Sequence, residues 1–158
     1  MDRYMIAALD QAHLSMAEDG YPVGSVVVRD GEIIGRGRNR FLQSGDPTTH
    51  AEMKASRDLA KYAGGEVEAL LKGASVYTTM MPCEMCAGAI IRFGIARVVA
   101  GETQTYTDAV TETLMARQDI RVEVLPDPPC MAVVEQYVEA LSEWTRMMRA
   151  RTRSRLVL

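Results

Sequence analysis

Apolar residues return every three or four positions along the first stretch of the chain, from residue 2 to residue 18. This period is typical of a helix with one buried face. We therefore predict an amphipathic helix over 2–18. Its apolar stripe consists of Met5, Ala8, Leu9, Ala12 and Met16.

A change of pattern follows this helix. Residues 20–22 (Gly-Tyr-Pro) end it, and two short runs at 25–29 and 32–37 flank the pair Asp30-Gly31. Asp-Gly between two apolar runs is a strong signal for a two-residue hairpin turn. The two runs are therefore predicted to be antiparallel neighbours in a sheet.

Helical and extended patterns alternate over the rest of the chain, with Gly64-Gly65 and a polar connector between the second helix and the next strand. Helices that alternate with strands indicate an α/β domain whose sheet is covered on both faces. The remaining predicted elements are helix 50–63, strand 74–79, helix 83–93, strand 96–100, helix 108–117, strand 121–125 and a long C-terminal helix over about 131–148.

Composition supports one compact domain over residues 1–158. The chain is 47% hydrophobic and 25% charged, which is typical of globular proteins, and its length suits a single core. No run approaches the roughly 20 apolar residues of a membrane span. Residues 1–4 lack the basic-then-apolar pattern of a secretory signal.

A cluster of metal-binding residue types carries the candidate chemistry. His50-Ala51-Glu52 is followed thirty residues later by Pro82-Cys83-Glu84-Met85-Cys86. Proline favours a helix start, and residues three apart share a helix face, so both thiols should point the same way from one first turn. One imidazole and two thiolates leave the fourth position of a tetrahedral zinc open for water, as in catalytic sites. Glu52 is then placed to move protons without binding the metal.

Two other interpretations explain these residues less completely. A lone Cys-x-x-Cys could be a redox pair, but this would leave the His-x-Glu motif unexplained. A structural zinc would need a fourth protein ligand. His13 and Cys130 are better explained as an ordinary boundary histidine and a buried thiol. With two of three cysteines assigned to a metal, we expect a reducing, cytoplasmic location.

His50-x-Glu52 with Pro82-Cys83-x-x-Cys86 resembles the zinc-dependent nucleobase and nucleoside deaminases of the cytidine/deoxycytidylate deaminase superfamily. The resemblance covers roughly residues 2–126. It implies a three-layer α/β/α fold with a five-stranded mixed sheet, one Zn²⁺ per chain and a homodimer. Further similar runs are Tyr21-Pro22-Val23-Gly24, Gly35-Arg36-Gly37-Arg38-Asn39, Thr78-Thr79 and Ala87-Gly88-Ala89-Ile90-Ile91.

The resemblance also implies a substrate pocket for a heterocyclic base and water. Asn39 would hydrogen-bond the ring, although on sequence alone it could simply cap a turn. Tyr106 would cover the ring and Trp144 would gate the pocket. The alternative for Trp144 is core packing, since Val134, Tyr137, Val138, Leu141 and Met148 share its helical stripe. The remaining implied pocket residues are Val23, Ala51, Met80 and Met81.

Two branches of this family remain alternatives for the function of this chain. The run from Gly101 to Tyr106 resembles fungal-type cytosine deaminases, which act on a free base. Those enzymes carry an acidic residue shortly after the tryptophan, where residues 145–148 here read Thr-Arg-Met-Met, so a related amino-substituted ring could be the substrate instead. The alternative is a transfer-RNA adenosine deaminase acting at the anticodon wobble position, which has some similarity to this chain.

The C-terminal segment 145–158 bears on this choice, because it holds five arginines and no acidic residue. A basic helix could grip RNA phosphates. Removing five from 18 basic residues leaves 13 against 21 acidic ones, a net charge of −8 for the rest, which would repel a polyanion. The arginines could instead neutralise the body or serve a subunit interface. We therefore favour a free base over RNA.

Overall fold

The computed structural model describes residues 2–61, 64–103 and 109–155, with side chains in the same ranges except at 109 and 144–155. The elements are α1 (Arg3–Ala17), β1 (Gly24–Arg29), β2 (Glu32–Arg38), α2 (Phe41–Ser44), α3 (Ala51–Asp58), the 3₁₀ turn η1 (Leu59–Lys61), α4 (Val67–Leu71), β3 (Ser75–Thr78), α5 (Glu84–Arg92), β4 (Arg97–Ala100), α6 (Ala109–Ala116), β5 (Arg121–Val124) and α7 (Pro128–Arg155).

The strands form one mixed sheet of five strands in the order β2-β1-β3-β4-β5. β1 pairs antiparallel with both β2 and β3, whereas β3, β4 and β5 are parallel to one another. The predicted hairpin is confirmed, with Asp30 and Gly31 at φ 51° and 81° in its turn. The predicted α/β/α fold with a five-stranded mixed sheet is confirmed as well.

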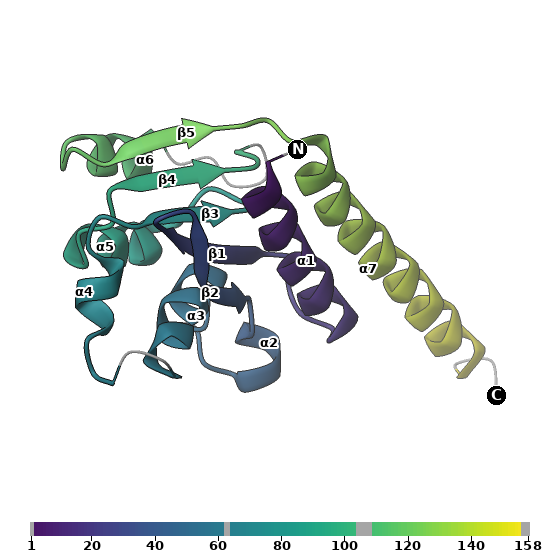
Figure 1. Ribbon diagram of the computed structural model, residues 1–158. Coiled ribbons are helices and arrows are strands. Elements are labelled where there is room, and N and C mark those ends of the chain that lie inside the picture. The colour runs from purple at the N-terminus through teal and green to yellow at the C-terminus, as the bar shows by residue number, and fades with distance from the viewer. Residues whose placement is uncertain (1, 62–63, 104–108, 156–158) are drawn as a thin grey trace.

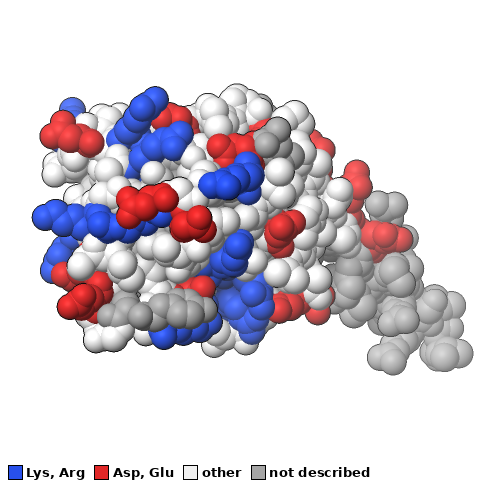
Figure 2. Space-filling model, viewed as in Figure 1, with Lys and Arg blue, Asp and Glu red and all other residues white. Residues whose placement is uncertain are grey.

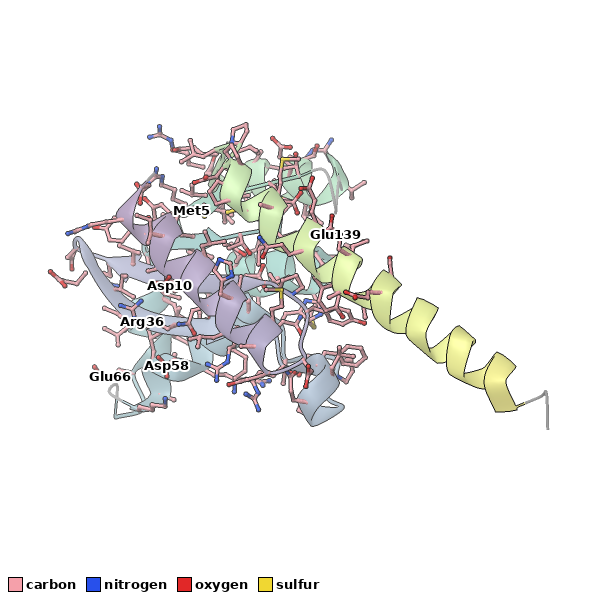
Figure 3. All side chains as sticks on the ribbon, turned by 90° about the vertical axis from the view of Figure 1, so that its right-hand side faces the viewer. Met5, Asp10, Arg36, Asp58, Glu66 and Glu139 are labelled. Atoms are coloured by element: carbon pink, nitrogen blue, oxygen red, sulfur yellow. The ribbon has the colours of Figure 1, made fainter. Side chains whose placement is uncertain are left out.

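Alternate residues of the strands point into two separate hydrophobic cores, one on each face of the sheet. On β1, Val26 and Val28 face the layer formed by α1 and the start of α7, whereas Val27 faces α3, α4, α5 and α6. Figure 1 shows α1 and α7 on one side of the sheet, with the other helices grouped away from them. In Figure 3 these two helices run beside one another, and the buried Met5 marks the end of α1 that approaches α7.

Two glycines let helices approach the sheet closely on opposite faces. A Cβ at Gly24 would lie 2.0 Å from the Ala8 carbonyl oxygen on α1, and one at Gly37 would lie 2.2 Å from the Ala51 carbonyl oxygen on α3. Neither space admits a side chain. The N-terminus of α3 is therefore seated directly on β2, which positions the residues around Glu52.

Several predicted boundaries were wrong. The helix expected over 50–63 becomes α3 followed by η1, and the polar connector contains the short helix α4, which holds the buried Leu71. The single-turn helix α2 was not predicted. Helices of four or five residues carry too little periodicity to be recognised in a sequence.

The C-terminal helix is longer than expected at both ends. α7 begins at Pro128, because proline suits the first helical position, and it continues through the arginine-rich segment to Arg155. Its 28 residues span roughly 42 Å. Its first turns hold Cys130 and Val133 in the core, while its far end extends beyond the body (Figure 1). Within the described residues, no helix is both long and apolar enough to cross a membrane.

Candidate metal centre and active site

Two helix N-termini meet at the end of β3. His50 is the N-cap residue of α3 and Cys83 the N-cap residue of α5, and neither side chain caps its own helix. Cys86 lies one turn into α5, on the same side as Cys83. The positive ends of both helix dipoles therefore face the three side chains, which favours thiolates there.

The donor atoms of His50, Cys83 and Cys86 lie within 4.8 Å of one another, so these three residues could hold a metal ion. His50 Nδ1 lies 3.4 Å from Cys83 Sγ and 3.7 Å from Cys86 Sγ. Tetrahedral zinc with ordinary bond lengths would separate a nitrogen and a sulfur ligand by roughly 3.6 Å. The donor set and its spacing fit zinc.

The two thiols are coupled through a shared hydrogen bond. That bond, together with the one to His50, lowers the pKa of Cys83 to about 4. The same bond and burial raise the pKa of Cys86. The contact with Cys83 also raises the pKa of His50. Cys83 is thus held as a thiolate, the form that binds metal.

Glu52 lies beside the thiols in the first turn of α3 and is 6% exposed. Its Oε1 accepts a hydrogen bond from the Thr78 hydroxyl (3.2 Å), and its Oε2 accepts one from the Cys86 thiol (3.4 Å). Burial raises the pKa of this carboxyl. A carboxyl whose pKa is raised in the direction of neutral pH is suited to accept a proton and return it.

A pocket of about 500 Å³ opens in front of this cluster. Of the predicted pocket residues, Val23, Asn39, Met80 and Met81 line it, as do His50, Glu52 and Cys83. Ala51 does not line the pocket and is fully buried. Tyr106 and the side chain of Trp144 lie outside the described residues.

Asn39 caps a turn and also lies in the pocket wall. Its side-chain Oδ1 accepts from the Phe41 backbone N–H (3.0 Å), so it does cap a turn. It also lines the pocket and is 6% exposed. The capping bond fixes the orientation of the amide, and its NH₂ group remains the part that can serve a ligand.

Sequence reasoning did not identify an aromatic cluster at the pocket mouth. The Tyr21 ring stacks on Phe41 at 6.2 Å and meets the Tyr137 ring edge-on at 5.9 Å. All three line the pocket, together with Pro22, Val134 and Val138. Tyr21 had stood out only as part of a family-like run, and no sequence signal joined it to α7.

The core alternative for the stripe of Val134, Tyr137, Val138 and Leu141 holds only at its start, where the half-buried Val134 packs against the cluster that contains Cys130 and Val133. Val138 and Leu141 are 54% and 47% exposed, and Val134 and Tyr137 line the pocket. Beyond its first turns α7 has left the sheet, so Val138 and Leu141 have no core of this chain to pack against.

Comparison with known proteins agrees with this geometry. Residues 1–102 match the family model for the cytidine and deoxycytidylate deaminase zinc-binding region. A cytosine deaminase of Candida albicans is 33% identical over 87% of this chain and 89% of its own length. A tRNA-specific adenosine deaminase of Buchnera aphidicola is 42% identical, but over 63% of this chain and only 60% of its own length.

Solved structures share the fold. A structure from work on A-to-I editing by tRNA:A34 deaminases at the wobble position has a TM-score of 0.68 and 30% identity, and it covers 82% of this chain and 97% of its own. A guanine deaminase from Nitrosomonas europaea has a TM-score of 0.72 at 24% identity, with 85% and 82% coverage. The second likeness, at this identity, supports only the common fold.

Proposed function

The chain belongs to the cytidine and deoxycytidylate deaminase zinc-binding family, and from this premise we propose that it hydrolytically deaminates a free amino-substituted nucleobase or related heterocycle. The observation that carries the proposal is the placement of a buried, proton-accepting Glu52 at the floor of a largely apolar pocket, directly beside three zinc-compatible donors. The family is zinc-binding in general, and His50, Cys83 and Cys86 are the residues that would hold one Zn²⁺ here.

When bound, zinc lowers the pKa of water towards neutrality and so supplies a nucleophile. The residues of the chain do the rest. Glu52 accepts a proton from the attacking water and returns it to the departing amine, so the products are the ring carbonyl and ammonia. Thr78 orients the Glu52 carboxylate through its hydroxyl. Asn39 holds the ring, and Val23 and Met80 provide apolar walls that exclude water.

A free base is favoured over RNA by the extent of the sequence matches, although in structure the match from work on tRNA:A34 deaminases also covers 82% of this chain. The match to cytosine deaminase covers 87% of the chain and therefore includes much of the C-terminal third, whereas the match to the transfer-RNA enzyme covers 63%. The −8 charge outside the arginine segment points the same way. On the face shown in Figure 2, acidic and basic side chains lie interspersed.

The alternative, adenosine deamination at the wobble position of transfer RNA, is favoured by one observation. The helix α7 continues through the arginine-rich segment to Arg155, beyond the body and downstream of the pocket-lining Tyr137. A basic helix so placed could contact the backbone of a bound RNA.

A panel of free bases, nucleosides and transfer RNA, scored for ammonia release, separates the two functions. Turnover of a small neutral base should vary little with ionic strength, whereas RNA turnover should fall steeply with salt. Deleting residues 149–158 should leave base turnover largely intact. If neither form consumes a free base and the deletion abolishes activity on transfer RNA, the alternative is correct.

We further propose that the active form is a homodimer built around α5. Met85, Ile91 and Phe93 are only half-buried in the single chain, and Arg92 is exposed, which leaves an apolar surface for a partner subunit. Sedimentation as a monomer at micromolar concentration would contradict this assembly.

A further inference from the structure

A buried serine outside the pocket is hydrogen-bonded to the backbone of two pocket-lining residues. Ser15 lies in the last turn of α1 and is fully buried. Its hydroxyl lies 2.6 Å from the Tyr21 carbonyl oxygen and 2.8 Å from the Asn39 carbonyl oxygen. A serine has one O–H proton, so these two carbonyls share it. Without that donor, the buried Asn39 carbonyl would lose its hydrogen bond with Ser15 at a considerable cost, whereas the part-buried Tyr21 carbonyl would still accept from the Val23 N–H (2.8 Å).

Both carbonyls belong to segments that form the recognition wall, which we define as the pocket-lining residues Tyr21, Val23, Asn39, Phe41 and Tyr137. The Asn39 N–H also donates to the Val23 carbonyl oxygen (3.0 Å), so the two segments are joined directly to each other as well. The Ser15 hydroxyl therefore lies at the junction of the two chain segments that precede and follow the β1–β2 hairpin.

The same helix end holds the segment 38–43 at three further points. The Glu18 carboxylate accepts hydrogen bonds from the Arg38 guanidinium at 3.0 and 2.7 Å and pairs with Arg40. The Gln43 side chain donates to the Glu18 carbonyl oxygen (2.9 Å). These contacts flank Asn39 on both sides, so they restrict the backbone that carries its amide.

The end of α1 is itself well determined. The N–H groups of Asp19 and Gly20 donate to the carbonyl oxygens of Met16 and Ser15, the pattern of a Schellman motif, with Asp19 at φ 60°. A Cβ at Gly20 would lie 2.3 Å from the Gln43 amide nitrogen, so the segment 38–43 packs closely on this helix end. A fixed helix end is a suitable anchor for a wall built from loops.

We propose that Ser15 is a positioning residue that holds the Tyr21 and Asn39 segments at the spacing the substrate ring requires. The function it serves is the proposed deamination, and it acts through Asn39 without touching the substrate. Ser15→Ala should therefore weaken substrate binding and loosen the segment 38–44. It should leave the metal donors unchanged, because they lie on α3 and α5.

The chain offers a matched control. Ser25 is also fully buried, and its hydroxyl also donates to a backbone carbonyl, that of Tyr77 (2.9 Å), but it lies within the sheet. Ser25→Ala removes the same kind of bond without touching the recognition wall. A second test variant is Glu18→Gln, which weakens the contacts of Glu18 with the same segment. Because Glu18 is half-exposed, this variant should fold even if Ser15→Ala does not.

Hydrogen exchange by mass spectrometry and steady-state kinetics decide the proposal. In Ser15→Ala, the amides of 38–44 should exchange about tenfold faster, while those of 84–92 keep the wild-type rate. With whichever panel compound the wild type consumes, KM should rise about tenfold and kcat should change little. Zinc content should stay at the wild-type level, and Ser25→Ala should show neither effect.

Unchanged exchange over 38–44, or an unchanged KM, overturns the role of Ser15. An equal KM rise in Ser25→Ala also overturns it, because the effect would then follow from general destabilisation. If the wild type consumes no free base, the proposed function fails, and the kinetics are repeated with transfer RNA as the substrate. If that too is not consumed, exchange that accelerates over 38–44 only in Ser15→Ala still supports the role, and its absence refutes it.

Discussion

The two sides of the pocket differ in how they are built. The metal wall, which consists of His50, Glu52, Cys83 and Cys86, comes from the first turns of two helices and surrounds a buried carboxylate. The recognition wall comes from the segment after α1, the segment after β2 and one face of α7, and Tyr21 within it is 37% exposed. The metal wall is therefore set by local helix geometry, whereas the recognition wall depends on contacts between distant segments.

The two walls also differ in how far the family match covers them. Residues 1–102, which contain the whole metal wall, match the family model, whereas α7 lies beyond that match. Under the proposed function, we expect changes in α7 and in the two loops to alter which ring fits without disturbing the donors. Variants of the metal wall should therefore act on turnover, and variants of the recognition wall on binding.

The largest effect is expected from removing a metal ligand. Cys86→Ala should lose most bound zinc and with it essentially all deamination, because two donors remain where catalytic sites use three. Metal analysis by mass spectrometry measures this directly. Cys130→Ala removes the third cysteine, buried on the opposite face of the sheet, and should keep zinc. Full zinc retention and activity in Cys86→Ala would refute the metal site.

Glu52→Gln should separate metal binding from proton transfer. The amide preserves size but cannot accept the proton, so kcat should fall by about 10²–10⁴-fold while zinc content and circular dichroism stay as in the wild type. Glu112→Gln, an exposed position on α6, serves as the control. Turnover by Glu52→Gln at a near wild-type rate means that the mechanism is wrong.

Asn39→Asp should separate the two roles of Asn39. The aspartate keeps an oxygen to accept the Phe41 N–H, so the turn and the melting temperature should be preserved. It replaces the NH₂ donor with an acceptor, so KM should rise by about tenfold or more with a smaller change in kcat. An unchanged KM would show that Asn39 only caps its turn.

The smallest effect concerns the ion pairs behind the recognition wall. Hydrogen bonding from Arg38 lowers the pKa of Glu18 in the folded protein. A lowered folded pKa stabilises the protein above the unfolded value of about 4.3, and this stabilisation is lost as the pH falls through the folded pKa. Glu18→Gln should thus lower the melting temperature slightly at pH 7 and not at all well below pH 4.

The matched control for this experiment is Glu68→Gln, which removes a more exposed pair with Arg92 at 3.7 Å. Exposed pairs contribute little, so its melting curve should follow that of the wild type at every pH. A difference between wild type and Glu18→Gln that persists unchanged into acid would show that packing, and not charge, connects Glu18 to its arginines.

The sequence by itself determined the α/β class, the hairpin at Asp30-Gly31 and the placement of His50, Glu52, Cys83 and Cys86 on two helix starts. Each of these depends on residues within one turn or one strand, where hydrophobic period, turn chemistry and ligand spacing act locally. The short helices α2 and α4 were missed because they are held by neighbours: the Arg29 guanidinium, for example, donates to the Ala69, Leu70 and Lys72 carbonyls.

The family resemblance already implied Val23 and Asn39 as pocket residues, but only the tertiary structure decided how the recognition wall is assembled. The contact between Tyr21 and Tyr137 joins residues more than a hundred positions apart, and the Ser15 hydroxyl reaches two segments on either side of a hairpin. The periodicity of the sequence cannot predict these long-range contacts, because they follow from how α1 and α7 pack on one face of the sheet. The stripe of α7 left both core and pocket open for the same reason: its apolar spacing is identical whether it faces a sheet or a pocket.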